Sequence, residues 1–263
     1  MDLFGIRSLL FLPASNPRAI ARARGAGADL VVLDLEDAVK PEDKDSARQA
    51  AVDAVAEQWP MPVAIRINGV GSQWHSLDID AVSRSSAQLA VIPRAASPNI
   101  VRADREALGR PVLTMIETAA GVLAAARIAG ESAALVAGTN DLSADLRLPA
   151  DAGRQSLQMA LQSIVLAARA AGIPVFDGVF NGLSDPDGFL AQADEGRRLG
   201  FDGKSLIHPD QIEACHRAFA PSEAQIDRAR RLVAAASGGA ERFEDQMIER
   251  MHVAAAERLL ARV

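Results

Sequence analysis

The chain has 263 residues, of which 49% are hydrophobic and 24% are charged, and its formal net charge is −6 at pH 7. This length and composition fit one large α/β domain or two small ones with a substantial apolar core. The acidic balance disfavours nucleic acid or an anionic membrane as the main partner.

Cysteine content and the N-terminal sequence indicate the compartment. The single cysteine, Cys215, cannot form an intrachain disulfide, and no run approaches the roughly 18 apolar residues of a membrane-spanning helix. The start of the chain lacks the basic residues and the long apolar region of a signal peptide. We therefore expect a cytoplasmic protein in which Cys215 has a structural role.

From Arg7 onward one unit repeats: a short apolar run, a polar or Gly/Pro break, and a segment with helical periodicity. The runs are too short for helices and too continuously apolar for strands with a solvent-exposed face, so we predict parallel strands buried on both sides. The predicted strands are residues 8–12, 30–35, 63–67, 89–92, 112–116, 134–137, 174–176 and 201–206. The helices predicted to follow them are residues 17–25, 43–58, 74–83, 98–108, 118–129, 153–171, 185–199 and 209–219.

Strands and helices that alternate in this way predict a (β/α)8 barrel, the TIM-barrel fold, over residues 1–220. An open doubly wound sheet is the alternative, but no Gly-x-Gly-x-x-Gly follows the first strand. Two further helical stretches, residues 222–236 and 241–262, exceed what a barrel needs. They predict a C-terminal helical arm over residues 221–263 that packs on the barrel or on a neighbouring subunit.

Two of the apolar runs end in a carboxylate that an Ala-rich helical segment follows. Residues 113–121 (LTMIETAAG) contain Glu117, and residues 137–145 (AGTNDLSAD) contain Asp141. Active sites of such barrels lie at the carboxyl ends of the strands, so acids from neighbouring strands can share one ion. Oxygen ligands of this kind suit Mg²⁺ or Mn²⁺. The alternative is that each acid stabilises the first turn of the helix that follows.

Arg66 follows an apolar strand, where an unpaired guanidinium would be costly. It can bind a substrate carboxylate bidentately, or it can pair with Glu36 or Asp37. These two adjacent acids would repel each other unless a metal or an arginine shares their charge. We expect them to support the metal site and to orient Arg66 for catalysis.

Other polar side chains at the strand ends are candidates for ligand binding. Those predicted to bind substrate beside Arg66 are Asn68, Thr139 and Asn140. Residues 13–18 place Ser15, Asn16 and a helix N-terminus at a strand end, which favours an anion. Together with Arg18 and Lys44, they are predicted to hold a phosphorylated carrier.

Several segments resemble the citrate lyase β-subunit-like family, which includes citryl-, malyl- and citramalyl-CoA lyases. The segments are residues 7–18 (RSLLFLPASNPR), 32–39 (VLDLEDAV), 66–68 (RIN), 116–122 (IETAAGV) and 200–209 (GFDGKSLIHP). Their order is that of the family, and the resemblance covers nearly the whole chain.

The resemblance implies a TIM barrel, Mg²⁺ held by Glu117 and Asp141, and Arg66 on the substrate carboxylate. It also implies coenzyme A near residues 15–18 and a trimer or a dimer of trimers. In several family members an aspartate of a terminal Met-Ile-Asp motif, supplied by the adjacent subunit, acts in catalysis. Residues 247–249 are Met-Ile-Glu, so Glu249 stands in that place with one more methylene.

We therefore predict a Mg²⁺-dependent carbon–carbon lyase for a short 3-hydroxyacyl-CoA with a carboxylate beside its hydroxyl, such as citramalyl-, malyl- or citryl-CoA. The metal would lower the pKa of the hydroxyl, Glu249 would remove its proton, and cleavage would give a 2-oxo acid and acetyl-CoA. One alternative is a class II pyruvate-type aldolase that acts on free aldols, although such aldolases usually carry a histidine where this chain has Asp37. Another is a non-catalytic relative that binds a CoA ester or a 2-oxo acid.

Overall fold

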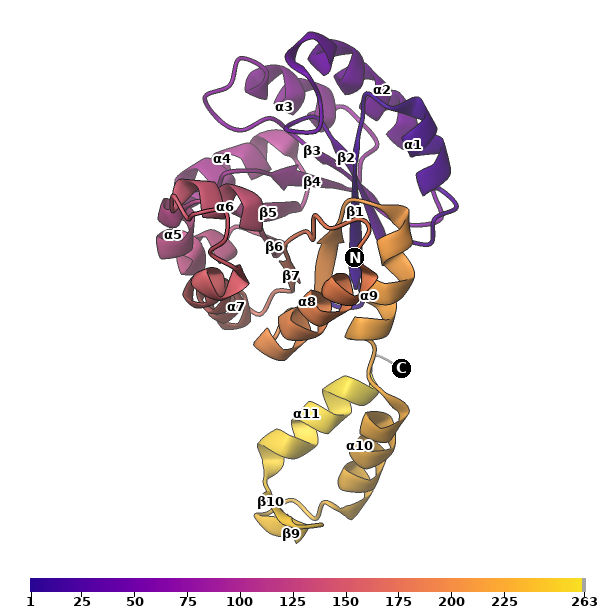
Figure 1. The fold of residues 1–263 in the computed structure, drawn as a ribbon, viewed down its shortest axis with the longest axis vertical. Helices are drawn as coiled ribbons and strands as arrows, with labels where there is room; N and C mark the ends of the chain where they lie inside the picture. The colour runs from indigo at the N-terminus through magenta and orange to yellow at the C-terminus, as the bar shows by residue number, and fades with distance from the viewer. Residues whose placement is uncertain (262–263) are drawn as a thin grey trace. The chain divides into compact units, whose positions relative to one another are not determined.

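The computed structural model describes residues 1–261. Its parallel strands are β1 (Ser8–Pro13), β2 (Leu30–Asp34), β3 (Val63–Arg66), β4 (Leu89–Ile92), β5 (Val112–Ile116), β6 (Ala134–Ala137), β7 (Val175–Asp177) and β8 (Gly203–Leu206). They form one closed barrel in this order, and β8 pairs with β1 (Figure 1). The predicted (β/α)8 barrel is confirmed.

Helices follow the strands and surround the barrel (Figure 1). They are α1 (Pro17–Ala23), α2 (Lys44–Ala56), α3 (His75–Ser83), α4 (Pro98–Leu108), α5 (Ala119–Ala129), α6 (Thr139–Asp145), α7 (Gln158–Ala171), α8 (Pro186–Leu199) and α9 (Ile212–Phe219). Asn16, Thr118 and Asp185 cap α1, α5 and α8 by accepting a backbone N–H of the first turn. Among residues 1–261, no helix is long and apolar enough to span a membrane.

Side chains of the strands alternate between the barrel interior and the layer beneath the helices. The interior cluster includes Leu9, Leu30, Val32, Ala64, Leu89, Val91, Leu113, Met115, Ala134, Val136 and Phe176. The side chains that alternate with them along each strand point outward and pack against the helices. At the carboxyl ends of the strands, Asp34, Arg66 and Glu117 take the next interior positions. The period of two along each strand therefore directs these charged groups to one end of the barrel.

The chain divides into two compact units, Met1–Phe219 and Ala220–Val263. The second contains α10 (Glu223–Ala235), β9 (Glu241–Phe243), β10 (Gln246–Ile248) and α11 (Arg250–Leu260). The prediction of one helix over residues 241–262 is wrong in its first part, because β9 and β10 pair as an antiparallel hairpin. Glu244 turns the hairpin with a φ of 52°, which a helix interior does not allow. Arg262 lies outside the described residues.

Candidate functional site

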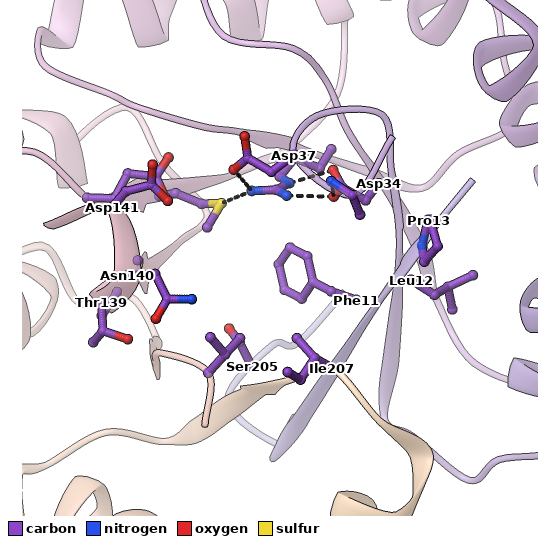
Figure 2. A pocket seen from close by; sticks show the side chains of 17 residues that line it. Phe11, Leu12, Pro13, Asp34, Asp37, Thr139, Asn140, Asp141, Ser205 and Ile207 are labelled. Carbon is purple, nitrogen blue, oxygen red and sulfur yellow. Dashed lines mark hydrogen bonds and ion pairs between the residues drawn. The ribbon is translucent and has the colours of Figure 1, made fainter. Parts of the chain in front are cut away.

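A cavity of about 400 Å³ opens at the carboxyl ends of the barrel strands (Figure 2). In the close view, Asp34 and Asp37 lie on one side, Asn140 and Asp141 lie on the other, and Phe11 lies between them. The lining combines the acids Asp34, Asp37, Glu117 and Asp141 and the base Arg66 with apolar side chains that include Phe11, Met115, Val179 and Ile207. The cavity therefore suits a small anion with an apolar part, provided that a cation offsets the acids.

Glu117 and Asp141 come from neighbouring strands, since β5 pairs with β6. Glu117 directly follows β5 and is 1% exposed, and Asp141 lies in the first turn of α6. One residue contacts both acids: the Arg94 N–H donates to Glu117 Oε1 at 2.6 Å, and Arg94 Nη1 donates to Asp141 Oδ1 at 3.1 Å. Glu117 Oε2 is buried and has no hydrogen-bond partner among residues 1–261.

The surroundings of these two acids fit a divalent cation. Burial raises the pKa of Glu117 to about 7 and also raises the pKa of Asp141, because burial disfavours the charged forms. In the part of the chain that the structure describes, no group of three or more His, Cys, Asp or Glu side chains could hold a metal. A site with two carboxylates still suits Mg²⁺, which binds through one or two carboxylates and keeps several waters or substrate atoms.

Gly138 packs directly against Glu117, and replacing it by alanine is expected to impair the site. A Cβ at Gly138 would overlap Glu117 Cβ and Oε2, so the carboxylate must move. A displacement of about 1 Å should lower kcat by about 100-fold. Turnover and Mn²⁺ binding of Gly138→Ala measure this effect. Gly130→Ala, whose Cβ would meet only an ordinary contact, is the matched control, and equal activity of both variants would contradict the expectation.

Arg66 is buried, and one edge of its guanidinium is already occupied. Nε and Nη2 each donate to an Asp34 carboxylate oxygen at 2.6 Å, and Asp34 also accepts the N–H groups of Glu36 and Ala38. Asp34 therefore occupies this edge of the guanidinium, and binding of a substrate carboxylate by Arg66 stays a prediction. The end that carries Nη1 remains, 3.0 Å from Glu36 Oε2 and 3.6 Å from Asp37 Oδ2.

The adjacent acids Glu36 and Asp37 have different surroundings. The Glu36 side chain is 10% exposed, and burial raises its pKa to about 8 against the lowering effect of Arg66. The Asp37 side chain is 65% exposed and lines the cavity. Burial and the Arg66 guanidinium therefore act in opposite directions on the pKa of Glu36, and Asp37 is the acid that a ligand can reach.

Lys44 and Asn68 are buried in the barrel wall. Lys44 Nζ donates to the carbonyls of Leu35 and Glu36 at 2.7 Å each and to Asn68 Oδ1 at 2.6 Å. The Asn68 amide donates to Leu35 O and to Asp78 Oδ2. These contacts occupy both side chains and hold the ends of β2 and β3 together. Coenzyme A binding by Lys44 and substrate binding by Asn68 stay predictions.

Replacing Lys44 by methionine is expected to lower stability without weakening coenzyme A binding. The variant leaves Asn68 Oδ1 without its donor, while Leu35 O keeps the Asn68 amide and Glu36 O keeps the Val39 N–H. The loss should be about 1–3 kcal/mol in the free energy of unfolding. Urea unfolding and calorimetric titration with coenzyme A measure the two effects. The exposed neighbour Lys40→Met is the control. A large loss of coenzyme A affinity with unchanged stability would instead show that Lys44 binds coenzyme A.

Ser15, Asn16 and Arg18 are exposed after β1, next to the cavity residue Pro13. Asn16 Oδ1 accepts the Ala19 N–H at 3.1 Å, so this side chain caps α1. The role of the three residues in coenzyme A binding stays a prediction.

Thr139 and Asn140 line the cavity, as expected for substrate-binding residues. Asn140 and Asn181 exchange amide hydrogen bonds of 2.9 and 3.3 Å. This pair joins the start of α6 to the segment that follows β7 at the cavity. Substrate binding by Thr139 and Asn140 stays a prediction.

Glu249 belongs to the second unit, where it precedes α11. Its N–H donates to His252 Nδ1 at 2.9 Å, and its carbonyl accepts the His252 N–H. The catalytic role of Glu249 stays a prediction. Cys215 is buried, its Sγ donates to Arg7 O at 3.2 Å, and burial raises the pKa of its thiol to about 12, so it fits the structural role.

Two residues that hold the site together are not assigned by the sequence analysis. Asp34 is the register partner of Arg66 across β2 and β3. Each is the last residue of its strand, and this shared position could have predicted the pair from the sequence. Arg94 contacts both acids through a backbone turn with a φ of 49°. No sequence pattern predicts that turn, because left-handed backbone favours glycine.

Comparisons with known proteins identify the family. Residues 7–209 match the HpcH/HpaI aldolase/citrate lyase family. The chain is 37% identical to a (3S)-malyl-CoA thioesterase of Cereibacter sphaeroides, over 97% of this chain and 94% of that protein. It is 34% identical to the citrate lyase subunit beta of Escherichia coli (strain K12), over 89% of this chain and 83% of that protein.

Similar solved structures come from Mycobacterium tuberculosis. CitE in complex with magnesium, acetoacetate and coenzyme A gives a TM-score of 0.87 at 33% identity, over 99% of both chains. The citrate lyase beta subunit complexed with oxaloacetate and magnesium gives a TM-score of 0.76 at 33% identity, over 84% of this chain and 100% of that one. The chain therefore belongs to the HpcH/HpaI aldolase/citrate lyase family and is a lyase-type enzyme, as its motifs predicted.

Proposed function

We propose that this enzyme is a Mg²⁺-dependent carbon–carbon lyase that cleaves a short 3-hydroxyacyl-CoA, with a carboxylate beside the hydroxyl, to a 2-oxo acid and acetyl-CoA. The observation that carries the proposal is the acid pair. Glu117 and Asp141 open onto the same cavity as Arg66, and Glu117 Oε2 lacks a partner among the described residues. The similar CitE structure with magnesium, acetoacetate and coenzyme A supports a site of this kind.

The residues around the cavity would divide binding and orientation among them. Glu117 and Asp141 would hold Mg²⁺, which as a Lewis acid polarises substrate oxygens when bound. Arg66 Nη1 would donate to the substrate carboxylate, since the other edge of the guanidinium stays on Asp34. The Phe11 ring lies 5.6 Å from Arg66 Cζ and covers it. Excluding water in this way strengthens the hydrogen bonds of the guanidinium.

Coenzyme A would lie at the rim of the barrel. Ser15, Asn16 and Arg18 are exposed beside Pro13, which lines the cavity. Their backbone and side-chain donors would meet the phosphates of the carrier, and the thioester would reach down past Pro13. Lys44 takes no part, because its three donors are engaged.

Cleavage breaks the bond between the hydroxyl-bearing carbon and the carbon next to the thioester. The hydroxyl proton passes to a base, and the O–H electron pair forms the carbonyl of the 2-oxo acid. The electron pair of the broken bond forms the acetyl-CoA enolate, which then takes up a proton. Glu36 and Asp37, near Arg66 Nη1, would keep the guanidinium oriented throughout.

We assign the base to Glu249 of a neighbouring subunit in a trimer or a dimer of trimers, with residues 221–263 as the arm that delivers it. Mixing two inactive variants, Glu249→Gln and Glu117→Gln, should then restore part of the activity. Mixed oligomers contain sites that have an intact Glu117 and an intact Glu249. No recovery after subunit exchange would rule out a shared site.

The proposed function is tested by identifying products. Citramalyl-, malyl- and citryl-CoA are each incubated with the enzyme and Mg²⁺, and the acyl-CoA species and the 2-oxo acid are quantified by chromatography. We expect acetyl-CoA and 2-oxo acid in equal amounts, with activity lost in EDTA and restored by Mg²⁺ or Mn²⁺. Absence of cleavage, or activity that EDTA leaves unchanged, would refute the proposal. Cleavage of free aldols without coenzyme A would point to the aldolase alternative.

Thioester hydrolysis is the second candidate, favoured by the 37% identity to a (3S)-malyl-CoA thioesterase. The same assay separates the two reactions. Hydrolysis gives free coenzyme A and the intact hydroxy acid, whereas the lyase reaction gives acetyl-CoA. If both products form, a time course shows whether cleavage or hydrolysis comes first.

Lowering the pH is expected to weaken metal binding. Since burial raises the pKa of Glu117 to about 7 in the metal-free protein, below this value the cation must displace a proton from the carboxyl. The apparent Kd for Mn²⁺ should rise about tenfold for each pH unit below about 7 and should stay nearly constant above it. Titrations across this range measure the profile. A profile that breaks only near the ordinary pKa of glutamate would contradict this expectation.

A further inference from the structure

Arg94 follows β4 in a backbone conformation that arginine rarely adopts. Its φ is +49°, in the left-handed region. Such conformations persist where surrounding contacts fix them, and they gather at ligand sites. Two contacts fix this one: the Arg94 N–H donates to Glu117 Oε1 at 2.6 Å, and the N–H of the next residue, Ala95, donates to Met115 O at 3.3 Å. The strained turn therefore serves to place a peptide N–H on Glu117.

The side chain of the same residue reaches the other acid. Arg94 Nη1 donates to Asp141 Oδ1 at 3.1 Å. The stem runs over Gly69, where an added Cβ would lie 3.7 Å from Arg94 Cδ. Arg94 thus bridges the two acids, with its peptide N–H on Glu117 and its guanidinium on Asp141.

The guanidinium groups of Arg66 and Arg94 both lie near the two acids, but they differ in burial and in the number of hydrogen bonds that hold them. The Arg66 side chain is 9% exposed, and Asp34 holds it with two hydrogen bonds of 2.6 Å. The Arg94 side chain is 53% exposed and holds Asp141 by one hydrogen bond. Arg94 can therefore leave its acid at small cost, whereas Arg66 cannot.

We propose that Arg94 is a positioning residue that acts as a resident counter-cation: its guanidinium compensates Asp141 in the metal-free enzyme and leaves when a divalent cation binds, while its peptide N–H keeps Glu117 in place. This inference rests on the proposed metal site. Two positive charges compete for one carboxylate, so the guanidinium lowers the affinity of the site for the metal. In return, the metal-free acids are held in position before the cation arrives.

The test is a set of Mn²⁺ titrations followed by electron paramagnetic resonance. Arg94→Met keeps most of the side-chain length without the charge and should bind Mn²⁺ about tenfold more tightly than the wild type. Arg94→Lys keeps the charge and should stay within about twofold of the wild type. Arg102→Met is the matched control, because it removes an arginine of α4 that pairs with Glu131, and it should leave the affinity unchanged.

Thermal unfolding supplies a second readout that does not depend on turnover. Metal-free Arg94→Met should unfold at a lower temperature than the wild type, because Asp141 has lost its counter-charge, and it should gain more from added Mn²⁺. Arg94→Gln carries the same test if the methionine variant fails to fold.

The outcomes separate the inference from the metal site on which it rests. If Arg94→Met and Arg94→Gln bind Mn²⁺ no more tightly than the wild type, the inference about Arg94 is overturned and the proposed metal site still stands. Absence of Mn²⁺ binding by the wild type, or an affinity that Glu117→Gln leaves unchanged, overturns the proposed metal site and the inference with it.

Discussion

Replacing Glu117 by glutamine, or Asp141 by asparagine, is expected to abolish metal-dependent turnover while the barrel stays folded. Each change keeps the shape of the side chain, removes its charge, and puts an NH₂ group where an oxygen ligand stood. Loss of residues that merely support a metal ligand already costs 10–100-fold in affinity, so loss of a ligand should weaken Mn²⁺ binding by about 100-fold or more. Turnover at fixed Mg²⁺ should fall at least as far.

Stability distinguishes loss of the site from loss of the fold in this experiment. Burial disfavours the charged form of Glu117 in the metal-free protein, so Glu117→Gln should unfold at the same temperature as the wild type or higher at about pH 8. Glu106→Gln removes an exposed acid of α4 and is the matched control. Wild-type Mn²⁺ affinity in Glu117→Gln or Asp141→Asn would contradict the assignment of the metal ligands.

Replacing Asp34 by asparagine is expected to produce the largest loss of stability among these variants. Asp34 is 1% exposed and pairs with Arg66 through two hydrogen bonds of 2.6 Å. Neutralising Asp34 removes the bidentate partner of the buried Arg66 and leaves only Glu36 and Asp37 near Nη1, so the loss should reach about 3–5 kcal/mol. Urea unfolding measures the loss. Turnover should fall as well, because Arg66 is no longer held with Nη1 toward the cavity.

A double-mutant cycle separates the ion pair from the other contacts of Asp34, which also accepts the N–H groups of Glu36 and Ala38. Arg66→Met combined with Asp34→Asn should recover part of the stability, since no unpaired charge then remains in the barrel. Asp37→Asn, with a side chain that is 65% exposed, should change stability by less than about 1 kcal/mol. Strictly additive losses in the double variant would show that the pair is not coupled.

Most of the barrel could be predicted because its strands are buried on both sides. A run such as that of β5 stays apolar throughout, so its length separates it from a helix, and the barrel order follows from the repetition. The hairpin of the C-terminal arm could not be predicted in this way. The two strands within residues 241–248 have only three residues each, and half of the residues in this segment are charged. Its periodicity also suits a helix, but the positive φ of Glu244 turns the chain into a hairpin.

The candidate site divides in the same way. Glu117 and Arg66 could be placed at the barrel mouth because every second side chain of a strand points into the barrel. Arg66 takes the last such position of β3, and Glu117 takes the one directly after β5. Asn68 was predicted to bind a ligand because it follows β3, and Lys44 because it begins the helix after β2. Whether such a polar side chain faces the cavity or the wall depends on which carbonyls and acids lie within reach, and that is set by β2, β3 and α3 together.

The sequence by itself therefore determined the barrel, the family and the positions of the acid pair, because periodicity, strand length and the order of motifs are local properties of the chain. Only the tertiary structure decided which partner each charged group takes. Asp34 occupies one edge of the Arg66 guanidinium, and Arg94 spans Glu117 and Asp141. Such pairings join residues far apart in the sequence. For Asp34 and Arg66 burial makes the pairing selective, because a charge inside the barrel needs its counter-charge within hydrogen-bond distance.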